Sequence, residues 1–349
     1  MRALAVTLLL TLPISSLQAA EIVPGSGQWT PSVSFTTRKD ANTALSGVAC
    51  VPRTDRCIAV NDEARFAQFF AIGDNLIAPG KVIALLPRKT PEGKLEELDA
   101  EGVAYAPPRS SGQSGYFYVT GSHGLSHGGE QERSRYFVVR FPVDPATGEA
   151  AFRFDDDAPS PEVQASGRLS AAIATLPSLA PSVGRALQQQ GLNIEGLAVA
   201  GDQLLFGLRS PCINRQAFVV GVPIEALFGA AEPSATLAAL TLGDNTGIRD
   251  LARVNDGVLI LSGRSDDDRS PAETPCGDGA ARPVPSVWFW NGTPGTEAQP
   301  LGALPGFGAK DAAETLQLLS EDAGSYRVLV WKDNAPDGDP KEFIIPKAP

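Results

Sequence analysis

The chain has 349 residues, with 29 Lys and Arg against 40 Asp and Glu, which gives a formal net charge of -11. So acidic a chain repels the phosphate backbone, and we therefore expect no nucleic-acid partner. Its 35 glycines and 29 prolines imply many turns. Short runs of Val, Ile, Leu and Phe between these turns are typical of many short strands.

Residues 1–20 have the pattern of an export signal. A positive start is followed by an apolar run from Ala3 to Leu12 and by small residues up to Ala20. The run is too short for a membrane span, which needs about 20 residues, and no later segment is long and apolar enough for one. We expect cleavage after Ala19 or Ala20, export to the periplasm or the medium, no membrane span afterwards, and a single domain over residues 21–349. A buried N-terminal helix is the alternative.

Four cysteines in an exported chain indicate disulfide bonds. Cys50 and Cys57 flank a four-residue turn from Pro52 to Asp55, which would place them opposite each other on a β-hairpin. In a non-hydrogen-bonded antiparallel pair the Cα atoms lie about 4.5 Å apart, within disulfide reach. We expect a Cys50–Cys57 bridge and, by elimination, a Cys212–Cys276 bridge. Four free thiols are the alternative, and the absence of a Cys-x-x-Cys spacing disfavours zinc.

Similar short phrases recur along the chain, and each opens an apolar strand. Most intervals between them are about 55 to 65 residues, and most units hold a turn, a second strand and a third strand. Intervals of this size, with about four strands each, are typical of propeller blades. The expected fold class is all-β, a β-propeller of five four-stranded blades; six blades, or a β-sandwich with a helical insert, are the alternatives. The phrases begin at Ser46, Glu101, Glu195, Arg249 and Ala313.

Two segments do not follow the repeat. The interval between the second and third phrases is longer and holds a predicted helical insertion near residues 168–190, with Pro181 near a helix start and Gly191 just past a helix end. The last unit ends after its third strand. We expect Val33 to Thr37 to supply the missing outer strand, which would close the ring and hide a strand edge.

A polar site is predicted on one face of this ring. Because successive strands of a blade run in opposite directions, each innermost strand starts on the face where the second strand ends. Charged residues beside glycines at such strand ends let a ligand approach. The alternative is that these charges pair with one another and join the blades. The residues expected to bind a ligand at this face are Asp62, Glu63, Glu101, Ser122, Glu195, Arg209, Arg249, Asp250, Arg264 and Glu314.

The residue types at this face suggest two kinds of ligand. Arginine makes bidentate contacts to carboxylates and phosphates, so the predicted ligand is a small polar or anionic molecule. Carboxylates suit calcium, which takes six to eight oxygen ligands, so calcium is the cofactor that we consider. The three arginines are Arg209, Arg249 and Arg264, and the carboxylates are Asp62, Glu63, Glu101 and Glu195.

His123 is the candidate catalytic residue. Histidine titrates near neutral pH and can act as a general acid or base, with a hydrogen-bonded structural histidine as the alternative. His123 and His127 also have the spacing of a zinc pair on a helix. The glycines around them disfavour a helix, and therefore zinc.

Five ordered phrases extend over much of the chain: Asp99 to Ala104, Val119 to His123, Leu192 to Ala198, Gly207 to Pro211, and Gly247 to Leu251. Together they resemble the bacterial family known as domain of unknown function 3616. This resemblance implies a propeller-like fold and no established activity. A weaker similarity, through the Glu-Gly phrases alone, is to the phytase-like propeller esterases, and it assigns no catalytic residue.

Two functional hypotheses follow. The first is an exported propeller that binds a small polar or anionic ligand at its mouth, with metal-assisted hydrolysis of a phosphate or carboxylate ester as its enzymatic form. The second is a non-catalytic propeller that binds a protein partner. A deep mouth with unpaired arginines and carboxylates favours the first. A mouth sealed by ion pairs, with an exposed apolar face elsewhere, favours the second.

Overall fold

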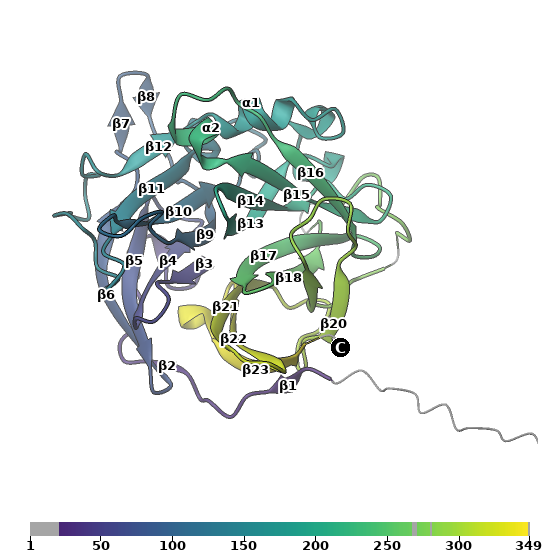
Figure 1. Cartoon of the computed structure of the whole chain (residues 1–349). Coiled ribbons are helices and arrows are strands. Elements are labelled where there is room, and N and C mark those ends of the chain that lie inside the picture. Colours follow the sequence, from purple (N-terminus) through teal and green to yellow (C-terminus); the bar gives the residue numbers. More distant parts are fainter. Residues whose placement is uncertain (1–20, 267–270, 280, 348–349) are drawn as a thin grey trace, which may run out of the picture.

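A computed structural model describes residues 21–266, 271–279 and 281–347, so the predicted export signal lies outside the described residues. Five sheets with four antiparallel strands each stand around a central axis like the blades of a propeller (Figure 1). This arrangement confirms the all-β propeller with five blades, rather than six blades or a sandwich. Within the described ranges, no helix has the length and apolarity needed to cross a membrane.

The strands of each blade follow one another outward from the axis. The first blade contains β3 (Leu45–Cys50), β4 (Arg56–Asn61), β5 (Phe66–Gly73) and β6 (Leu76–Ala84). The second contains β9 (Ala100–Ala106), β10 (Gly115–Gly121), β11 (Val138–Val143) and β12 (Gln164–Ser166). The third contains β13 (Asn193–Ala200), β14 (Gln203–Ser210), β15 (Gln216–Pro223) and β16 (Thr236–Thr241). The fourth contains β17 (Thr246–Val254), β18 (Gly257–Arg264), β19 (Ser286–Trp290) and β20 (Gln299–Ala303). The fifth contains β21 (Ala313–Glu321), β22 (Ser325–Lys332), β23 (Lys341–Pro346) and β1 (Val23–Pro24).

The innermost strands β3, β9, β13, β17 and β21 contact one another in a closed ring around the axis. The repeated Glu-Gly phrases lie in this ring. A Cβ on Gly102 would lie 2.6 Å from the Cβ of Leu197, and a Cβ on Gly196 would lie 2.9 Å from the Cγ of Leu251. The glycine of each phrase is therefore needed because the next inner strand packs directly against it.

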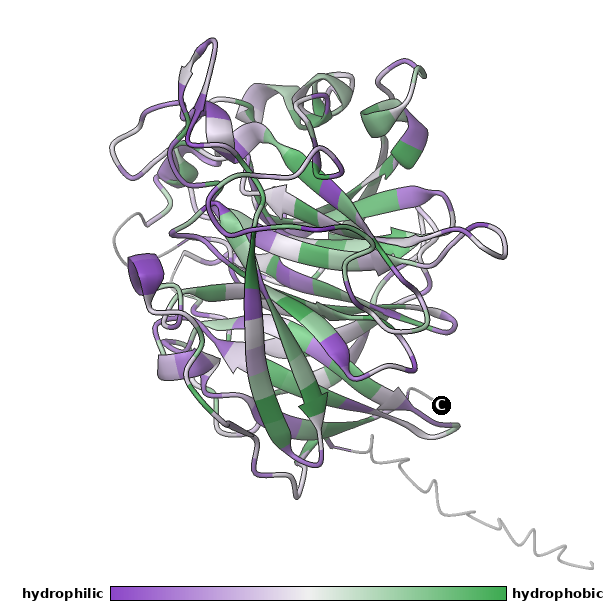
Figure 2. Ribbon diagram, turned by 90° about the vertical axis from the view of Figure 1, so that its left-hand side faces the viewer, coloured by the Kyte–Doolittle hydropathy of each residue, from purple (hydrophilic) through white to green (hydrophobic). Residues whose placement is uncertain are grey.

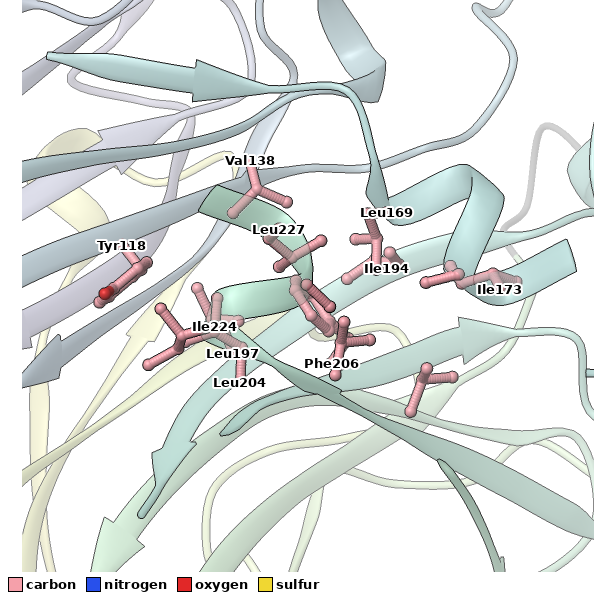
Figure 3. Close-up of a cluster of buried hydrophobic side chains, with 14 of the residues drawn as sticks. Tyr118, Val138, Leu169, Ile173, Ile194, Leu197, Leu204, Phe206, Ile224 and Leu227 are labelled. Carbon is pink, nitrogen blue, oxygen red and sulfur yellow. The ribbon is translucent and has the colours of Figure 1, made fainter. Parts of the chain in front are cut away.

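The hydrophobic core lies between the blades. Figure 2 shows apolar residues along the strands and hydrophilic residues in many of the connecting loops. One large cluster lies between the second and third blades and includes Tyr118, Leu197 and Phe206 (Figure 3). Two short helices, α1 (Leu169–Ala174) and α2 (Ile224–Phe228), cover this cluster with their buried apolar residues.

The predicted helical insertion is present as three short pieces. These are α1, the 3-10 turn η3 (Ala180–Ser182) and the 3-10 turn η4 (Leu187–Gln189). Pro181 lies in the first turn of η3, as its position near a helix start predicts. Gly191 follows η4, where a Cβ would lie only 2.0 Å from the carbonyl oxygen of Arg185.

The N-terminal segment closes the ring, but with a different strand from the one expected. β1 (Val23–Pro24) pairs with β23 as the outer strand of the fifth blade, so the prediction that Val33 to Thr37 form this strand is wrong. Phe35 instead packs its ring against Phe70 of the first blade and Trp331 of the fifth. Its side chain is 2% exposed, because it fills the junction between the two blades.

Further contacts hold this segment in place, and we call residues 22–37 the clasp. β2 (Thr30–Pro31) pairs in parallel with β6 of the first blade. Trp29 donates its indole N–H to Glu342 Oε2 at 2.8 Å, and the backbone N–H of Phe35 donates to Asp337 Oδ1 at 2.8 Å. The clasp therefore connects the last blade of the ring to the first (Figure 1).

Both predicted disulfides are confirmed. Cys50 and Cys57 are opposite each other in the β3–β4 ladder, with Cα atoms 3.9 Å apart. Cys212 and Cys276 lie on loops after the second strands of the third and fourth blades, with Cα atoms 5.5 Å apart. The second bridge therefore fixes two neighbouring blades to each other.

The remaining short elements lie in connecting segments. A hairpin of β7 and β8 projects from the ring between the first and second blades (Figure 1). Three 3-10 turns occur elsewhere in the described chain. The bounds are β7 (Lys89–Thr90), β8 (Gly93–Lys94), η1 (Arg38–Asp40), η2 (Arg133–Tyr136) and η5 (Pro336–Gly338).

Candidate functional site

A cavity of about 880 Å³ opens on the face where the second strands end, and we call it the mouth cavity. All five blades contribute to its lining, because inner-strand starts and second-strand ends share this face as the repeat predicts. The structure brings together seven of the residues predicted for ligand binding. These are Asp62, Glu63, Glu101, Arg209, Arg249, Arg264 and Glu314.

Arg249 is the centre of an ion-pair network in the cavity wall, in which Arg209, Arg249 and Glu314 line the cavity and Glu195 lies behind them. Its Nε lies 2.8 Å from Glu195 Oε2 and 3.1 Å from Glu314 Oε2, and its Nη2 contacts the other oxygen of Glu314. Arg209 Nη1 donates to Glu195 Oε1 at 3.0 Å. Glu195 is 3% exposed and Arg249 is 8% exposed. These four side chains therefore neutralise one another while joining the third, fourth and fifth blades.

Arg264 also has a carboxylate partner. Its Nη2 lies 2.9 Å from Asp266 Oδ1, and Arg209 Nη2 donates to the backbone oxygen of Asp266 at 2.9 Å. Each of the three arginines predicted to hold an anion is thus bound to an acidic residue of the protein. The sequence left paired charges as an alternative, and the structure shows such pairs for these arginines. The pairs of Arg249 cross between blades, whereas Arg264 pairs within the fourth blade.

Two carboxylates at the cavity have no such partner. Within the described parts of the chain, the structure records no hydrogen bond or ion pair to the carboxylate of Asp62 or Glu101, and Asp62 Oδ1 is buried. Burial, together with the nearby carboxylates of Asp99 and Asp333, raises the pKa of Asp62 to about 8. Burial, followed by the carboxylates of Asp99, Glu195 and Asp62, raises the pKa of Glu101 well above its usual value. At neutral pH the raised pKa keeps a proton on Asp62, and no ion pair to either carboxylate is recorded in the described residues.

Asp99 and Asp333 flank these two carboxylates. Asp99 accepts from Arg135 Nη1 at 2.7 Å, so its charge is balanced by that guanidinium. Asp333 accepts from the backbone N–H of Asn334 at 2.7 Å, and burial followed by the charge of Glu314 raises its pKa to about 6. Asp99 immediately precedes an inner strand, so its position in the repeat could have identified it. Arg135 lies in a 3-10 turn without any pattern in the sequence.

His123 lies behind the cavity wall rather than in it. Its ring is 1% exposed, stands 5.5 Å from the ring of Tyr136, and has Nδ1 3.3 Å from Ser170 Oγ. Burial lowers the pKa of His123 to about 3, so the ring is neutral at ordinary pH. His127, in contrast, is exposed and lines the cavity.

Ser122 and Asp250 also lie outside the cavity lining. Ser122 Oγ accepts from the backbone N–H of Gly124 at 3.2 Å. Asp250 accepts from the backbone N–H groups of Leu251 and Leu316 at 2.7 Å each, which ties the fourth blade to the fifth. Both side chains are buried and satisfied by the backbone.

The arrangement of the carboxylates can be compared with that of a calcium site. Among the described residues, no three His, Cys, Asp or Glu side chains come together as ligands of a metal ion do. The calcium hypothesis therefore draws its support from the chemistry of the unpaired carboxylates and not from a preformed cage of oxygens.

The sequence matches a family model over residues 128–341, more than half of the chain, and that family is described as a protein of unknown function (DUF3616). The chain belongs to this family. The match confirms the resemblance that the five phrases indicated. A search of curated proteins finds no relative of this DUF3616 protein.

Several solved structures are similar to this DUF3616 protein. Regucalcin from Agrobacterium tumefaciens, a calcium-binding protein, is 10% identical over 93% of this chain and 97% of its own, with a TM-score of 0.40. The PQQ-bound aldose sugar dehydrogenase from Streptomyces coelicolor is 12% identical over 94% and 99%, with a TM-score of 0.38. The WD40 propeller domain of Doa1 is 13% identical over 91% and 96%, with a TM-score of 0.34. At these scores we take no ligand or activity from them.

Proposed function

We propose that the protein is an exported propeller that binds a small organic cation in the mouth cavity. One observation carries the proposal: Asp62 and Glu101 line the cavity with no hydrogen bond or ion pair to their carboxylates among the described residues, whereas every arginine predicted to hold a ligand has an acidic partner. An ionised carboxylate taken out of water is costly unless a positive charge accompanies it. A ligand that brings this charge would stabilise both carboxylates together.

The size of the cavity supports an organic ligand. Small-molecule sites typically enclose about 300–1,000 Å³, and about 880 Å³ lies within this range and well above the space that one ion needs. The polar lining offers further hydrogen-bond partners, among them Glu63, His127 and Asn334. A hydrated calcium ion would meet the same carboxylates, so calcium is a separate arm of the test.

The proposal reverses the sign of the ligand that the arginines had suggested. An anion at Arg209 or Arg249 would have to displace Glu195 or Glu314 from close contacts. Ester hydrolysis is not part of the proposal, because the histidine expected to act as acid or base does not line the cavity. We therefore propose binding and assign no reaction.

Export is part of the proposal and has its own support. Two disulfides join parts of the described chain, and disulfides persist in oxidising compartments such as the periplasm. Residues 1–20 supply the leader in this proposal. Mass measurement of the mature protein from cell fractions would test it, and an intact leader in the cytoplasmic fraction would contradict it.

The protein-binding alternative has less support. It would be favoured by an apolar face, since an exposed apolar patch marks an interface. In the described ranges only four large apolar side chains are exposed: Val23, Val33, Leu76 and Val284.

A thermal-shift screen with matched compounds tests the proposed ligand class. A ligand that binds only the folded state raises the melting temperature, by the equivalent of about 2.7 kcal/mol at a hundred times its Kd. Glucosamine should raise it where glucose does not, and putrescine where butanediol does not. The variants Asp62→Asn and Glu101→Gln should lose this response. Stabilisation by phosphate or gluconate that survives in both variants, with none by the amines, would contradict the proposal.

A further inference from the structure

A second cavity of about 410 Å³ lies beside the mouth cavity, at the first blade, and we call it the side cavity. The two cavities share Glu63 and Glu97 in their linings. The turn between β4 and β5 contributes residues to both linings. Its first residue, Asp62, lines the mouth cavity, and its last, Arg65, lines the side cavity.

Most charges of the side cavity are paired within the protein. Three cations there each have a carboxylate partner in the same lining, and Glu97 is bound to Arg135 at 2.5 Å. Glu63 is exposed and belongs to both linings. The three pairs are Arg38 with Asp156 at 2.5 Å, Arg88 with Asp157 at 3.0 Å, and Lys94 with Glu96 at 2.8 Å.

Two cations remain after this pairing. Within the described residues, the structure records no carboxylate partner for the guanidinium of Arg65 or the ammonium of Lys39. Arg65 is partly buried, and one of its N–H groups donates to the carbonyl oxygen of Leu95. Burial and then the positive charge of Arg88 lower the pKa of Arg65 below its usual value, against the opposite effect of the carboxylates of Glu96 and Glu97, which lie nearby but form no ion pair with it in the described residues. Once these pairs are formed, two cations of the lining, Arg65 and Lys39, stand against one carboxylate, Glu63, for which the described residues show no ion pair.

The shape and composition of the lining also suit a ligand. Phe66 and Leu86, both buried, form an apolar part of the lining to which Arg65 also belongs. A guanidinium has five N–H donors in a planar fork that matches two oxygens of a carboxylate, phosphate or sulfate. In the described parts of the chain, one of these donors has a recorded acceptor, the carbonyl oxygen of Leu95.

We propose that the side cavity binds an anionic group, a carboxylate, phosphate or sulfate, through Arg65 with Lys39 as a second cation. The anion site stands independently of the mouth cavity. That one ligand occupies both cavities rests on the proposed function. Such a ligand would place a cationic group near Asp62 in the mouth cavity and an anionic group near Arg65 in the side cavity. The ligand class is therefore a zwitterion.

Titration calorimetry with inorganic phosphate tests the anion site on the full chain. Replacing Arg65 with Gln removes a charged hydrogen-bond donor, so binding of phosphate should weaken about tenfold or more. Lys39→Glu reverses an exposed charge and should weaken it by a similar factor. The control Arg153→Gln changes an exposed arginine outside both cavities and should leave the affinity unchanged.

Two further results separate this inference from the proposed function. If Arg65→Gln does not fold, Lys39→Glu alone decides, because its side chain is exposed. Phosphate that does not bind, or that binds Lys39→Glu as it binds wild type, would overturn the anion site. Asp62→Asn should leave phosphate binding intact while it abolishes binding of amines. Phosphoethanolamine should bind more tightly than phosphate or ethanolamine; no such gain, with the anion site intact, would refute the shared zwitterion.

Discussion

Replacing Asp62 with Asn should remove much of the pH dependence of stability that the mouth cavity causes. The pKa of Asp62 is raised from 3.8 to about 8, by burial first and then by neighbouring carboxylates. A carboxyl group with a higher pKa in the folded state binds its proton more tightly there. Its contribution to stability is therefore complete below the unfolded pKa and is lost as the pH rises through the folded pKa. The ligand-free protein should lose stability between about pH 4 and pH 8.

The size of this effect follows from the pKa. One pKa unit corresponds to about 1.4 kcal/mol, so the shift of Asp62 sets an upper limit of about 5 to 6 kcal/mol. The side chain is partly exposed to water and shares proton uptake with nearby carboxylates, so we expect about half of this, about 2–3 kcal/mol. In a chain of this length that corresponds to about 3–5 °C in Tm.

Unfolding of wild type and Asp62→Asn across this pH range measures the effect. Asparagine keeps the shape of the side chain and cannot ionise, so the variant should lose less stability as the pH rises, by about 2–3 kcal/mol. Asp202→Asn, on an exposed turn away from the cavities, should follow wild type. Parallel pH curves for wild type and Asp62→Asn would refute the view that this carboxylate is buried without a partner.

Two further predictions concern the frame that holds the cavities. Removing the Cys212–Cys276 bridge, whose sequence separation is 64, should cost about 4 kcal/mol of stability, and removing Cys50–Cys57, with a separation of 7, about 2.5 kcal/mol. The first loss is larger because a longer closed loop constrains the unfolded chain more. Urea midpoints of the two double-alanine variants rank the losses, and the opposite order would contradict the prediction. Phe35→Ala should cost about 3–5 kcal/mol of stability, since the phenyl ring is buried between the first and last blades. A loss below about 1 kcal/mol in the same assay would show that the clasp does not hold these two blades together.

The repeat could be predicted from the sequence because its cause is local. Gly47, Gly102 and Gly196 stand where inner strands touch, so the first three blades carry a glycine at the same place in a similar phrase, where the last two have Asp250 and Thr315. The Cys50–Cys57 bridge followed from the length of one turn. The outer strand of the last blade did not follow, because β1 has only two residues and pairs with a strand about 320 residues later in the chain.

The site was predicted as a set of residues but not as a set of contacts. Position in the repeat is enough to place Arg249 and Glu314 at one mouth, since both lie near the start of an inner strand. Whether Arg249 is bound to Glu314 or open to a ligand depends on side-chain conformations across two blades, which no sequence pattern records. The burial of His123 likewise depends on the ring of Tyr136, which ends the 3-10 turn η2, and no sequence pattern predicts that contact.

Proton release on ligand binding tests the central claim most directly. At pH 7 the raised pKa of Asp62, about 8, keeps a proton on this carboxylate, and a bound cation would favour its ionised form. Calorimetry of the strongest amine from the screen, in buffers with different heats of ionisation, should give a release of up to about one proton per ligand from Asp62. The variant Asp62→Asn should release fewer. Binding of the amine without proton release in wild type would contradict the account.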